Sequence, residues 1–198
     1  MALLLSWLIL AAVFLVLFWY AGYAWETFQM VRRPDRVIYH GSNLREQGPH
    51  LETLIRKYVP DTAAYALVEP GAGLGTVSRY LAQRFPWREA TAIEVGPYIL
   101  GLARMRAFFE RSPVRFIKED MFAYRFPQHS VVYCYLFPVM LQKLKEQGSL
   151  DGSLVISLTF PIPECPETEK VPLPSWQKAL FVYDFRELSR AAQQLDAA

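Results

Sequence analysis

A glycine-rich turn sets the strongest constraint on the fold of this chain. It lies in LVEPGAGLGTVSRYLAQRF, residues 67–85, where glycines recur at every second position between an apolar run and a segment of helical spacing. Glycine lacks a Cβ atom, so such a turn can bend sharply and bring its backbone close to a ligand. The sequence therefore predicts a buried strand that ends at Glu69, a ligand-binding turn, and a helix that starts near Leu74.

The segments that follow alternate between strand and helix patterns. Strands are predicted at 63–69, 89–95, 114–120, 130–137, 153–160 and 177–185, and helices at 50–58, 75–85, 97–111 and 138–147. Near-continuous apolar strands separated by helices indicate a parallel sheet covered on both faces. The five prolines of PIPECPETEKVPLP, residues 161–174, predict a loop, after which the last strand is expected beside the fifth.

The N-terminal segment has a different composition from the rest of the chain. Residues 2–25 carry no charged side chain. About 20 apolar residues, at about 1.5 Å rise per residue, cross the hydrocarbon core of a bilayer. Trp and Tyr side chains, which favour the headgroup level, gather at its end as Trp19, Tyr20, Tyr23 and Trp25. Residues 1–25 are therefore predicted to form one transmembrane helix that is retained as an anchor.

Two other interpretations of this segment stay open. A signal peptide could be cleaved after the small residues Gly22 and Ala24, but such a peptide usually carries Lys or Arg ahead of a shorter apolar core, and none precedes this one. A buried helix is the second alternative. It is disfavoured because the remainder of the chain already suffices for one α/β domain.

The charges after the anchor predict its orientation. Arg32, Arg33 and Arg36 follow the apolar segment, and no Lys or Arg lies before it. The positive-inside rule then puts the C-terminal domain in the cytoplasm, as in a single-pass protein of a bacterial inner membrane, and the same arginines can contact anionic lipid headgroups. We expect a juxtamembrane segment at 26–42, one domain at 43–187 and a polar tail at 188–198.

Composition argues against several classes of site. The cysteines and histidines are scattered, which predicts no metal site and no disulfide framework; they are Cys134, Cys165, His40, His50 and His129. The net charge of +2 argues neither for nor against nucleic acid. Four arginines cluster loosely between residues 104 and 115, and a solvated helix face explains them more simply than a nucleic-acid surface. We therefore expect no nucleic acid among the partners.

Two cofactors compete for the glycine-rich turn. A dinucleotide requires G-x-G-x-x-G/A, which Gly71 and Gly73 begin, but the third position falls at Thr76. Glu69 would also stand near the phosphates and repel them. S-adenosylmethionine has no phosphate and carries an ammonium and a sulfonium, so an acid at this turn is favourable.

EPGAGLG, residues 69–75, resembles motif I of the class I S-adenosylmethionine-dependent methyltransferases. The resemblance implies a Rossmann-like, mostly parallel sheet with an antiparallel strand near the C-terminus. It also implies cofactor contacts by the turn residues Glu69, Gly71, Ala72, Gly73 and Gly75, and by three later residues: Glu94 for the ribose hydroxyls, Asp120 for the adenine amine and Met121 on the adenine ring. The alternatives are a structural turn, a solvated strand-end carboxylate at Glu94, and a plain charged loop at 118–120.

Several longer segments resemble a narrower family, the small lysine methyltransferases that modify the adenine nucleotide translocase and the ATP synthase c-subunit, with their prokaryotic relatives. The segments are EVGPYILGLARMRAF at 94–108, YLFPVMLQKLKE at 135–146 and SLVISLTFPIP at 153–163, and the resemblance covers roughly 38–185. The chain departs from the family's Asp-led Gly-Ser/Ala-Gly-Asp-Gly at Glu69 and at Leu74, and Leu74 removes an acid near the cofactor.

The resemblance implies methylation of a protein lysine, which can belong to a membrane-embedded protein. The Asn/Asp-Pro-Pro-Tyr/Phe tetrad of base-amino methyltransferases is replaced by YCYLFP at 133–138, which disfavours a nucleobase acceptor. Tyr135 is the candidate catalytic residue that lines the acceptor channel, with core packing as its alternative, and FPIP at 160–163 is another candidate wall. Other functions stay open: a methyltransferase for a small molecule or lipid, an NAD-linked oxidoreductase, or a non-catalytic membrane scaffold.

Overall fold

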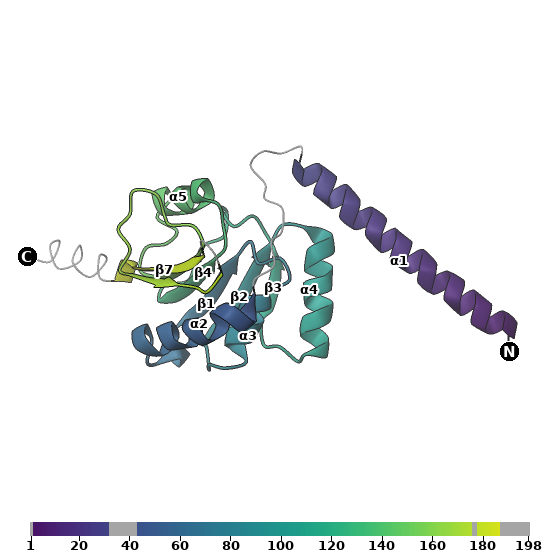
Figure 1. The fold of residues 1–198 in the computed structure, drawn as a ribbon, viewed down its shortest axis with the longest axis horizontal. Helices are drawn as coiled ribbons and strands as arrows, with labels where there is room; N and C mark the ends of the chain where they lie inside the picture. Colours follow the sequence, from purple (N-terminus) through teal and green to yellow (C-terminus); the bar gives the residue numbers. More distant parts are fainter. Residues whose placement is uncertain (1, 32–42, 176–177, 187–198) are drawn as a thin grey trace, which may run out of the picture. The chain divides into compact units, whose positions relative to one another are not determined.

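The computed structural model describes residues 2–31, 43–175 and 178–186 (Figure 1). The chain divides into two units, Met1–His40 and Gly41–Ala198. The predicted polar tail at 188–198 and most of the predicted juxtamembrane segment lie outside the described residues.

The described residues of the first unit form one long helix, α1 (Ala2–Val31). Its segment Leu5–Gly22 has a mean hydropathy of 2.1, and only 6% of that segment is buried. Large apolar side chains such as Trp7 and Phe14 are exposed along it. The helix is long and apolar enough to cross a membrane, a property that a signal sequence shares. It continues past Trp25, where the predicted span ends.

The second unit is built on a seven-stranded sheet with the order β3-β2-β1-β4-β5-β7-β6. Its strands are β1 (Ala66–Pro70), β2 (Glu89–Glu94), β3 (Arg115–Lys118), β4 (Ser130–Cys134), β5 (Leu154–Leu158), β6 (Glu169–Pro172) and β7 (Ala179–Asp184). Strands β1 to β5 pair in parallel, whereas β7 is antiparallel to both β5 and β6. The predicted Rossmann-like sheet with an antiparallel strand near the C-terminus is thereby confirmed.

Helices cover both faces of this sheet (Figure 1). They are α2 (Leu44–Tyr58), α3 (Thr76–Ala82), α4 (Pro97–Phe109) and α5 (Pro138–Glu146), and a short 3₁₀ turn, η1 (Thr62–Ala64), precedes β1. Right-handed crossovers place α3 and α4 on one face, because β1, β2 and β3 follow one another in the same direction across the sheet. The step from β4 to β5 runs the other way, so α5 lies on the opposite face. Strands β1, β4 and β5 are buried along their whole length, as expected for a sheet covered on both sides.

Helix α2 begins earlier than the sequence pattern predicts. Gly48 and Pro49 indicated an interruption, but the helix starts at Leu44 and runs through both residues. Gly48 fits because the ring of Tyr80 on α3 occupies the space beside it, and a Cβ there would lie 2.6 Å from the Tyr80 hydroxyl. The buried Gln47 of the same helix accepts a hydrogen bond of 2.9 Å from the hydroxyl of Tyr133 on β4. Helix α2 is thus fixed to the sheet through its first turns.

The proline-rich segment 161–174 was predicted to be a loop, and the structure differs in one part. Glu169–Pro172 forms β6, which pairs with β7 at the edge of the sheet. An edge strand tolerates proline because one side of it has no neighbouring strand to bond. The prolines of this segment are therefore compatible with a short strand, because that strand lies at the edge of the sheet.

A close approach joins the glycine-rich turn to β3. Gly75 has φ +61°, in the left-handed region, and a Cβ at this position would lie 2.5 Å from Cζ of the buried Phe116. A side chain at position 75 would have both backbone strain and a clash with an aromatic ring. Gly101 on α4 differs, because nothing lies within 4 Å of a Cβ built there.

We expect Gly75→Ala to lower the free energy of unfolding by about 2–4 kcal/mol, from the left-handed φ and from displacement of the Phe116 ring. Gly101→Ala is the matched control, and it should raise stability by up to about 1 kcal/mol through helix propensity. Urea titration of the full chain in detergent, followed by circular dichroism, measures both. Equal stabilities for the two variants would contradict the close approach.

Candidate functional site

The turn between β1 and α3 explains why glycine recurs at every second position. Gly71, Gly73 and Gly75 have φ values of +65°, +55° and +61°, so each adopts the left-handed conformation that other residues avoid. Gly71 also lies against the side chain of Leu136, which a Cβ there would approach to 2.9 Å. The N–H of Ala72 donates to the carbonyl of Ile93 at 2.9 Å, which fixes the turn to the end of β2.

Glu94 links this turn to the next one. Its Oε2 accepts a hydrogen bond of 2.8 Å from the N–H of Gly73. Its Oε1 accepts bonds of 2.8 Å from the N–H groups of Val95 and Gly96, which lead into α4. One carboxylate at the carboxyl end of β2 therefore organises the backbone after both β1 and β2. In open α/β sheets this edge is where ligands bind.

Glu69 is buried behind the turn. Its Oε2 accepts a hydrogen bond of 2.8 Å from the N–H of Ser78 in the first turn of α3. Burial raises the pKa of Glu69 to about 7, although the bond from Ser78 opposes the shift. Because ionisation of the buried carboxyl is unfavourable, its contribution to the free energy of unfolding declines as pH rises from about 4.5 to about 7. Near neutral pH this group can therefore gain or lose a proton.

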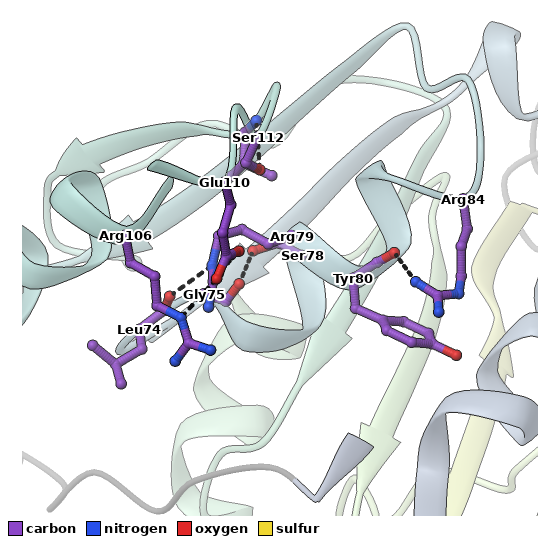
Figure 2. Close-up of polar contacts among 10 residues, drawn as sticks. Leu74, Gly75, Ser78, Arg79, Tyr80, Arg84, Arg106, Glu110 and Ser112 are labelled. Atoms are coloured by element: carbon purple, nitrogen blue, oxygen red, sulfur yellow. Dashed lines mark hydrogen bonds and ion pairs between the residues drawn. The ribbon is translucent and has the colours of Figure 1, made fainter. Parts of the chain in front are cut away.

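An ion network supports the turn from the side of α4 (Figure 2). Arg79 of α3 is buried, and its guanidinium pairs with Glu110, which also binds Arg106 at 2.8 Å. The hydrogen bonds from Arg106 and Arg79 lower the pKa of Glu110. The Nε–H of Arg79 donates to the carbonyl of Leu74 at 3.3 Å. The network connects the end of α4 to the last part of the glycine turn.

The third predicted acid, Asp120, follows β3 at the same edge of the sheet. Residues Glu69, Glu94 and Asp120 stand at or just after the carboxyl ends of three adjacent parallel strands. The Oδ1 of Asp120 accepts a hydrogen bond of 3.0 Å from the N–H of Phe122, and its side chain is exposed. Met121 beside it is half-buried. The structure thus places the three acids in the order and at the edge that the sequence predicts.

Aromatic side chains gather where β4 and β5 end. Tyr135 stacks on Phe160 with ring centroids 6.4 Å apart, and Phe137 contacts the same ring at 5.4 Å. Tyr135 is half-buried and packs partly against the core, and Phe137 is 41% exposed. Leu136, between them in sequence, contacts the glycine turn from the β4 side. The aromatic group therefore borders the turn, on the side away from β2.

An unusual backbone conformation holds Phe160 in this group. The N–H of Phe160 donates to the carbonyl of Leu158 at 2.9 Å, and Thr159 between them has φ +71°. This is the rarer, strained form of the γ-turn, and it is especially unfavourable for a β-branched residue. The buried hydroxyl oxygen of Thr159 has no hydrogen-bond partner among the residues that the structure describes. Strain and an unsatisfied polar group together mark this turn as a place to look for ligand contact.

Sequence reasoning missed two parts of this arrangement. Arg79 appeared only as a polar residue of a helix, because nothing in the local pattern indicates that its partner is Glu110 on another helix. Thr159 gave no signal either, since threonine is disfavoured at positive φ. Ser78 had a weak signal, because an N–H in the first turn of a helix requires an acceptor from elsewhere.

Other parts of the described chain give weaker evidence for a ligand site than the glycine turn does. A pocket of about 490 Å³ lies between the loop 122–128 and the turn 147–151. The loop follows Asp120, whose carbonyl accepts a hydrogen bond of 3.1 Å from the N–H of Tyr124, and it leads to the amino end of β4, whereas the turn precedes β5. No group of three or more His, Cys, Asp or Glu side chains that could hold a metal ion occurs within the residues described.

Several solved structures that share this fold are described as methyltransferases. An RNA methyltransferase from Salinibacter ruber in complex with S-adenosyl-L-homocysteine matches with a TM-score of 0.60 and 21% identity, over 70% of this chain and 92% of that one. The rRNA methyltransferase aviRa from Streptomyces viridochromogenes gives 0.58 and 13%, over 77% and 89%. The ribosomal protein L11 methylase from Lactobacillus delbrueckii subsp. bulgaricus gives 0.56 and 12%, over 72% and 79%. At these identities the likeness establishes the fold alone.

The sequence itself matches one family model. That model describes the ANTKMT methyltransferase domain, and it covers residues 69–169, from the acid of the glycine turn to β6. No curated protein sequence matches the chain. The matched segment contains the glycine turn, Glu94, Asp120 and the aromatic group, which are the features that the fold brings to one edge of the sheet. The chain therefore belongs to the ANTKMT methyltransferase domain family and is an S-adenosylmethionine-dependent methyltransferase.

Proposed function

We propose that the carboxyl edge of β1, β2 and β3 is the S-adenosylmethionine pocket of this enzyme. The observation that supports this most directly is the bond from the Gly73 N–H to Glu94, which holds the glycine turn against the end of β2. In the proposal Glu94 binds the ribose, Asp120 binds the adenine amine, and Met121 packs on the adenine ring. The backbone of 71–75 lies against the remainder of the cofactor.

The hydrogen-bonding capacity of the acids fits these roles. A carboxylate has about four acceptor sites, and Glu94 uses three of them for backbone N–H groups. One site is left for a ribose hydroxyl, and a second hydroxyl has to replace one of the backbone donors. The Oδ2 of Asp120 accepts no bond from the residues that the structure describes, so it is available to an exocyclic amine.

We expect Glu94→Gln to weaken the binding of S-adenosylhomocysteine by about 10- to 100-fold, since a charge-assisted hydrogen bond contributes about 1.5–3 kcal/mol. Glu89→Gln is the matched control, because Glu89 begins the same strand at the opposite edge and is exposed. The Glu89→Gln variant should bind S-adenosylhomocysteine with the affinity of the wild type. Isothermal titration calorimetry of the full chain in detergent measures both, and wild-type affinity in Glu94→Gln would refute the assignment.

Glu69 contributes through its charge in this proposal. Its carboxylate bonds to Ser78 and is buried, so it acts through space on the ammonium and sulfonium groups. A nearby positive charge favours the ionised carboxylate and lowers its pKa from about 7. Binding of the cofactor should therefore release a proton when the pH is near or below 7.

The affinity for S-adenosylmethionine should consequently rise by up to about tenfold between pH 6 and pH 8, because a single proton is released. Glu69→Gln, which cannot ionise, should bind with little pH dependence over the same range. Calorimetry in buffers of different ionisation enthalpy counts the released protons. The same pH profile in wild type and in Glu69→Gln would assign the titration to another group.

We further propose that the acceptor is the side-chain amine of a protein lysine. Membership of the ANTKMT methyltransferase domain family supports a lysine acceptor. The aromatic group beside the glycine turn supports it as well, since aromatic rings can bind an amine and its cation. S-adenosylmethionine supplies an electrophilic methyl group, so the chain has to align a neutral amine with it and exclude water. The faces of Tyr135, Phe137 and Phe160 can hold the amine and then the methylated cation, and the hydroxyl of Thr159 can accept a hydrogen bond from an N–H.

Anchoring by α1 is the last part of the proposal. Its apolar segment Leu5–Gly22 suits a membrane span, and the sequence places Arg32, Arg33 and Arg36 directly after the helix. The positive-inside rule then assigns the catalytic domain to the cytoplasmic side. A membrane-held enzyme of this kind can reach lysines that lie close to the bilayer surface, including those of membrane-embedded proteins.

Washed membranes that contain the full chain should transfer a labelled methyl group from S-adenosylmethionine to a protein band, and acid hydrolysis of that band should release methyllysine. Tyr135→Ala should reduce the transfer by at least about tenfold through lost alignment, whereas Tyr65→Ala, at the amino end of β1, should not. Label in the lipid or small-molecule fraction would instead support those acceptors, and no label would support a scaffold.

Carbonate extraction and intact mass of the same membranes test retention of residues 1–25.

A further inference from the structure

Helix α4 exposes large apolar side chains on the face that points away from the sheet. Tyr98, Met105, Phe108 and Phe109 are 36%, 53%, 79% and 76% exposed, and we call these four residues the α4 outer face. The opposite side of the helix already packs on the sheet through small and aliphatic residues, namely Ile99, Leu100, Ala103 and Ala107. A surface helix of a globular domain normally presents polar residues to solvent. The α4 outer face therefore has more apolar surface than the fold requires.

These side chains form a continuous stripe. Positions 98, 105 and 109 are separated by seven and four residues, the spacings that recur on one side of a helix, and 108 lies beside them. The rings of Phe108 and Phe109 contact each other edge to face at 5.7 Å. Helix α4 packs against β2 and β3, and β3 is the edge strand of the sheet (Figure 1). The stripe is thus a convex ridge at the border of the domain.

Positive charge surrounds the end of this stripe. Arg111 and Arg115 are exposed, and neither forms an ion pair within the part of the chain that the structure describes. Arg111 has φ +50° and donates its N–H to the carbonyl of Phe108, so it ends the helix in a conformation that glycine usually supplies. Arg104, on one flank, donates a hydrogen bond of 2.9 Å to the carbonyl of Phe116, which leaves its positive charge in place.

We propose that the α4 outer face rests on the surface of an anionic bilayer, with Phe108 and Phe109 at the headgroup level and Arg111 and Arg115 on lipid phosphates. Aromatic rings beside arginines are the composition that suits this interface, and the charges are complementary to anionic lipids. A convex ridge also fits a planar surface better than it fits a peptide, which binds in a groove. The inference goes beyond the proposed function, which assigns membrane contact to α1 alone.

The length of the connecting segment favours this occupant. Helix α1 ends at Val31 and α2 begins at Leu44, and the segment between them spans at most about 47 Å even when fully extended. If α1 crosses a bilayer, the domain stays close to that surface, and a weak contact by α4 becomes effective through its high local concentration. Only this point rests on the proposed anchor.

The test uses the full chain with Cys165→Ser, so that the remaining cysteine, Cys134, is buried. An environment-sensitive fluorophore is attached at Met105→Cys, or at Val139→Cys as the matched control, since Val139 is an apolar residue of α5 on the other face and is 72% exposed. The proteins are reconstituted into vesicles of phosphatidylcholine alone or mixed with phosphatidylglycerol. We expect a blue shift and a several-fold gain in emission at 105 with the anionic lipid, and neither change at 139.

Two double variants separate the apolar and the charged contribution. Phe108→Ser with Phe109→Ser should abolish the gain in emission at 105 with the anionic lipid, and Arg111→Gln with Arg115→Gln should make the emission at 105 the same with and without phosphatidylglycerol. Equal signals at 105 and 139 would overturn the proposal. A comparison in lipid nanodiscs that hold one or two copies of the chain tests the alternative occupant. A signal at 105 that appears only with two copies would also overturn the proposal, because a second chain would then cover the α4 outer face. Flotation of the same vesicles after a carbonate wash reports on α1 independently, so loss of the anchor and loss of α4 docking are distinguishable.

Discussion

The carboxylate of Glu94 is the interaction on which the binding edge depends. It accepts three backbone N–H groups, one from the turn after β1 and two from the turn after β2. Without such an acceptor, each of these buried donors would be costly. Glycine adopts left-handed conformations readily, and the bond from Gly73 to Glu94 holds the first turn in one of them. The same side chain therefore forms the turn and is proposed to hold the ribose, so structure and recognition are coupled there.

Charge is distributed around this edge at three depths. Glu94 is buried at the rim and accepts three backbone donors, Glu69 is buried with a pKa near 7, and Asp120 is exposed. Burial also raises the pKa of the neighbouring Cys134 thiol, which therefore stays neutral. The cofactor is cationic, so an interior carboxyl that ionises when a positive charge arrives can adjust to it. This separates a methyltransferase pocket from a phosphate-binding one, where an acid at the first strand would repel the ligand.

Much of the fold could be predicted from the sequence because its signals are local. Apolar runs gave the parallel strands, and the glycine spacing gave the turn, since left-handed φ is a property of single residues. The start of α2 and strand β6 were missed because tertiary contacts override the local effect of glycine and proline: Tyr80 fills the space beside Gly48, and β6 lies at an edge. The pairing of Arg79 with Glu110 and the strained Thr159 depend on residues distant in the chain, and no local pattern reports them.

The contact between Gly75 and Phe116 has a consequence for the evolution of related chains. The ring of a β3 residue fills the volume that a side chain at the last glycine of the turn would occupy. The two positions therefore share one space, although they are far apart in sequence. A homologue that has alanine or serine at the first position should carry a smaller residue at the second, so that substitutions at the pair are inherited together.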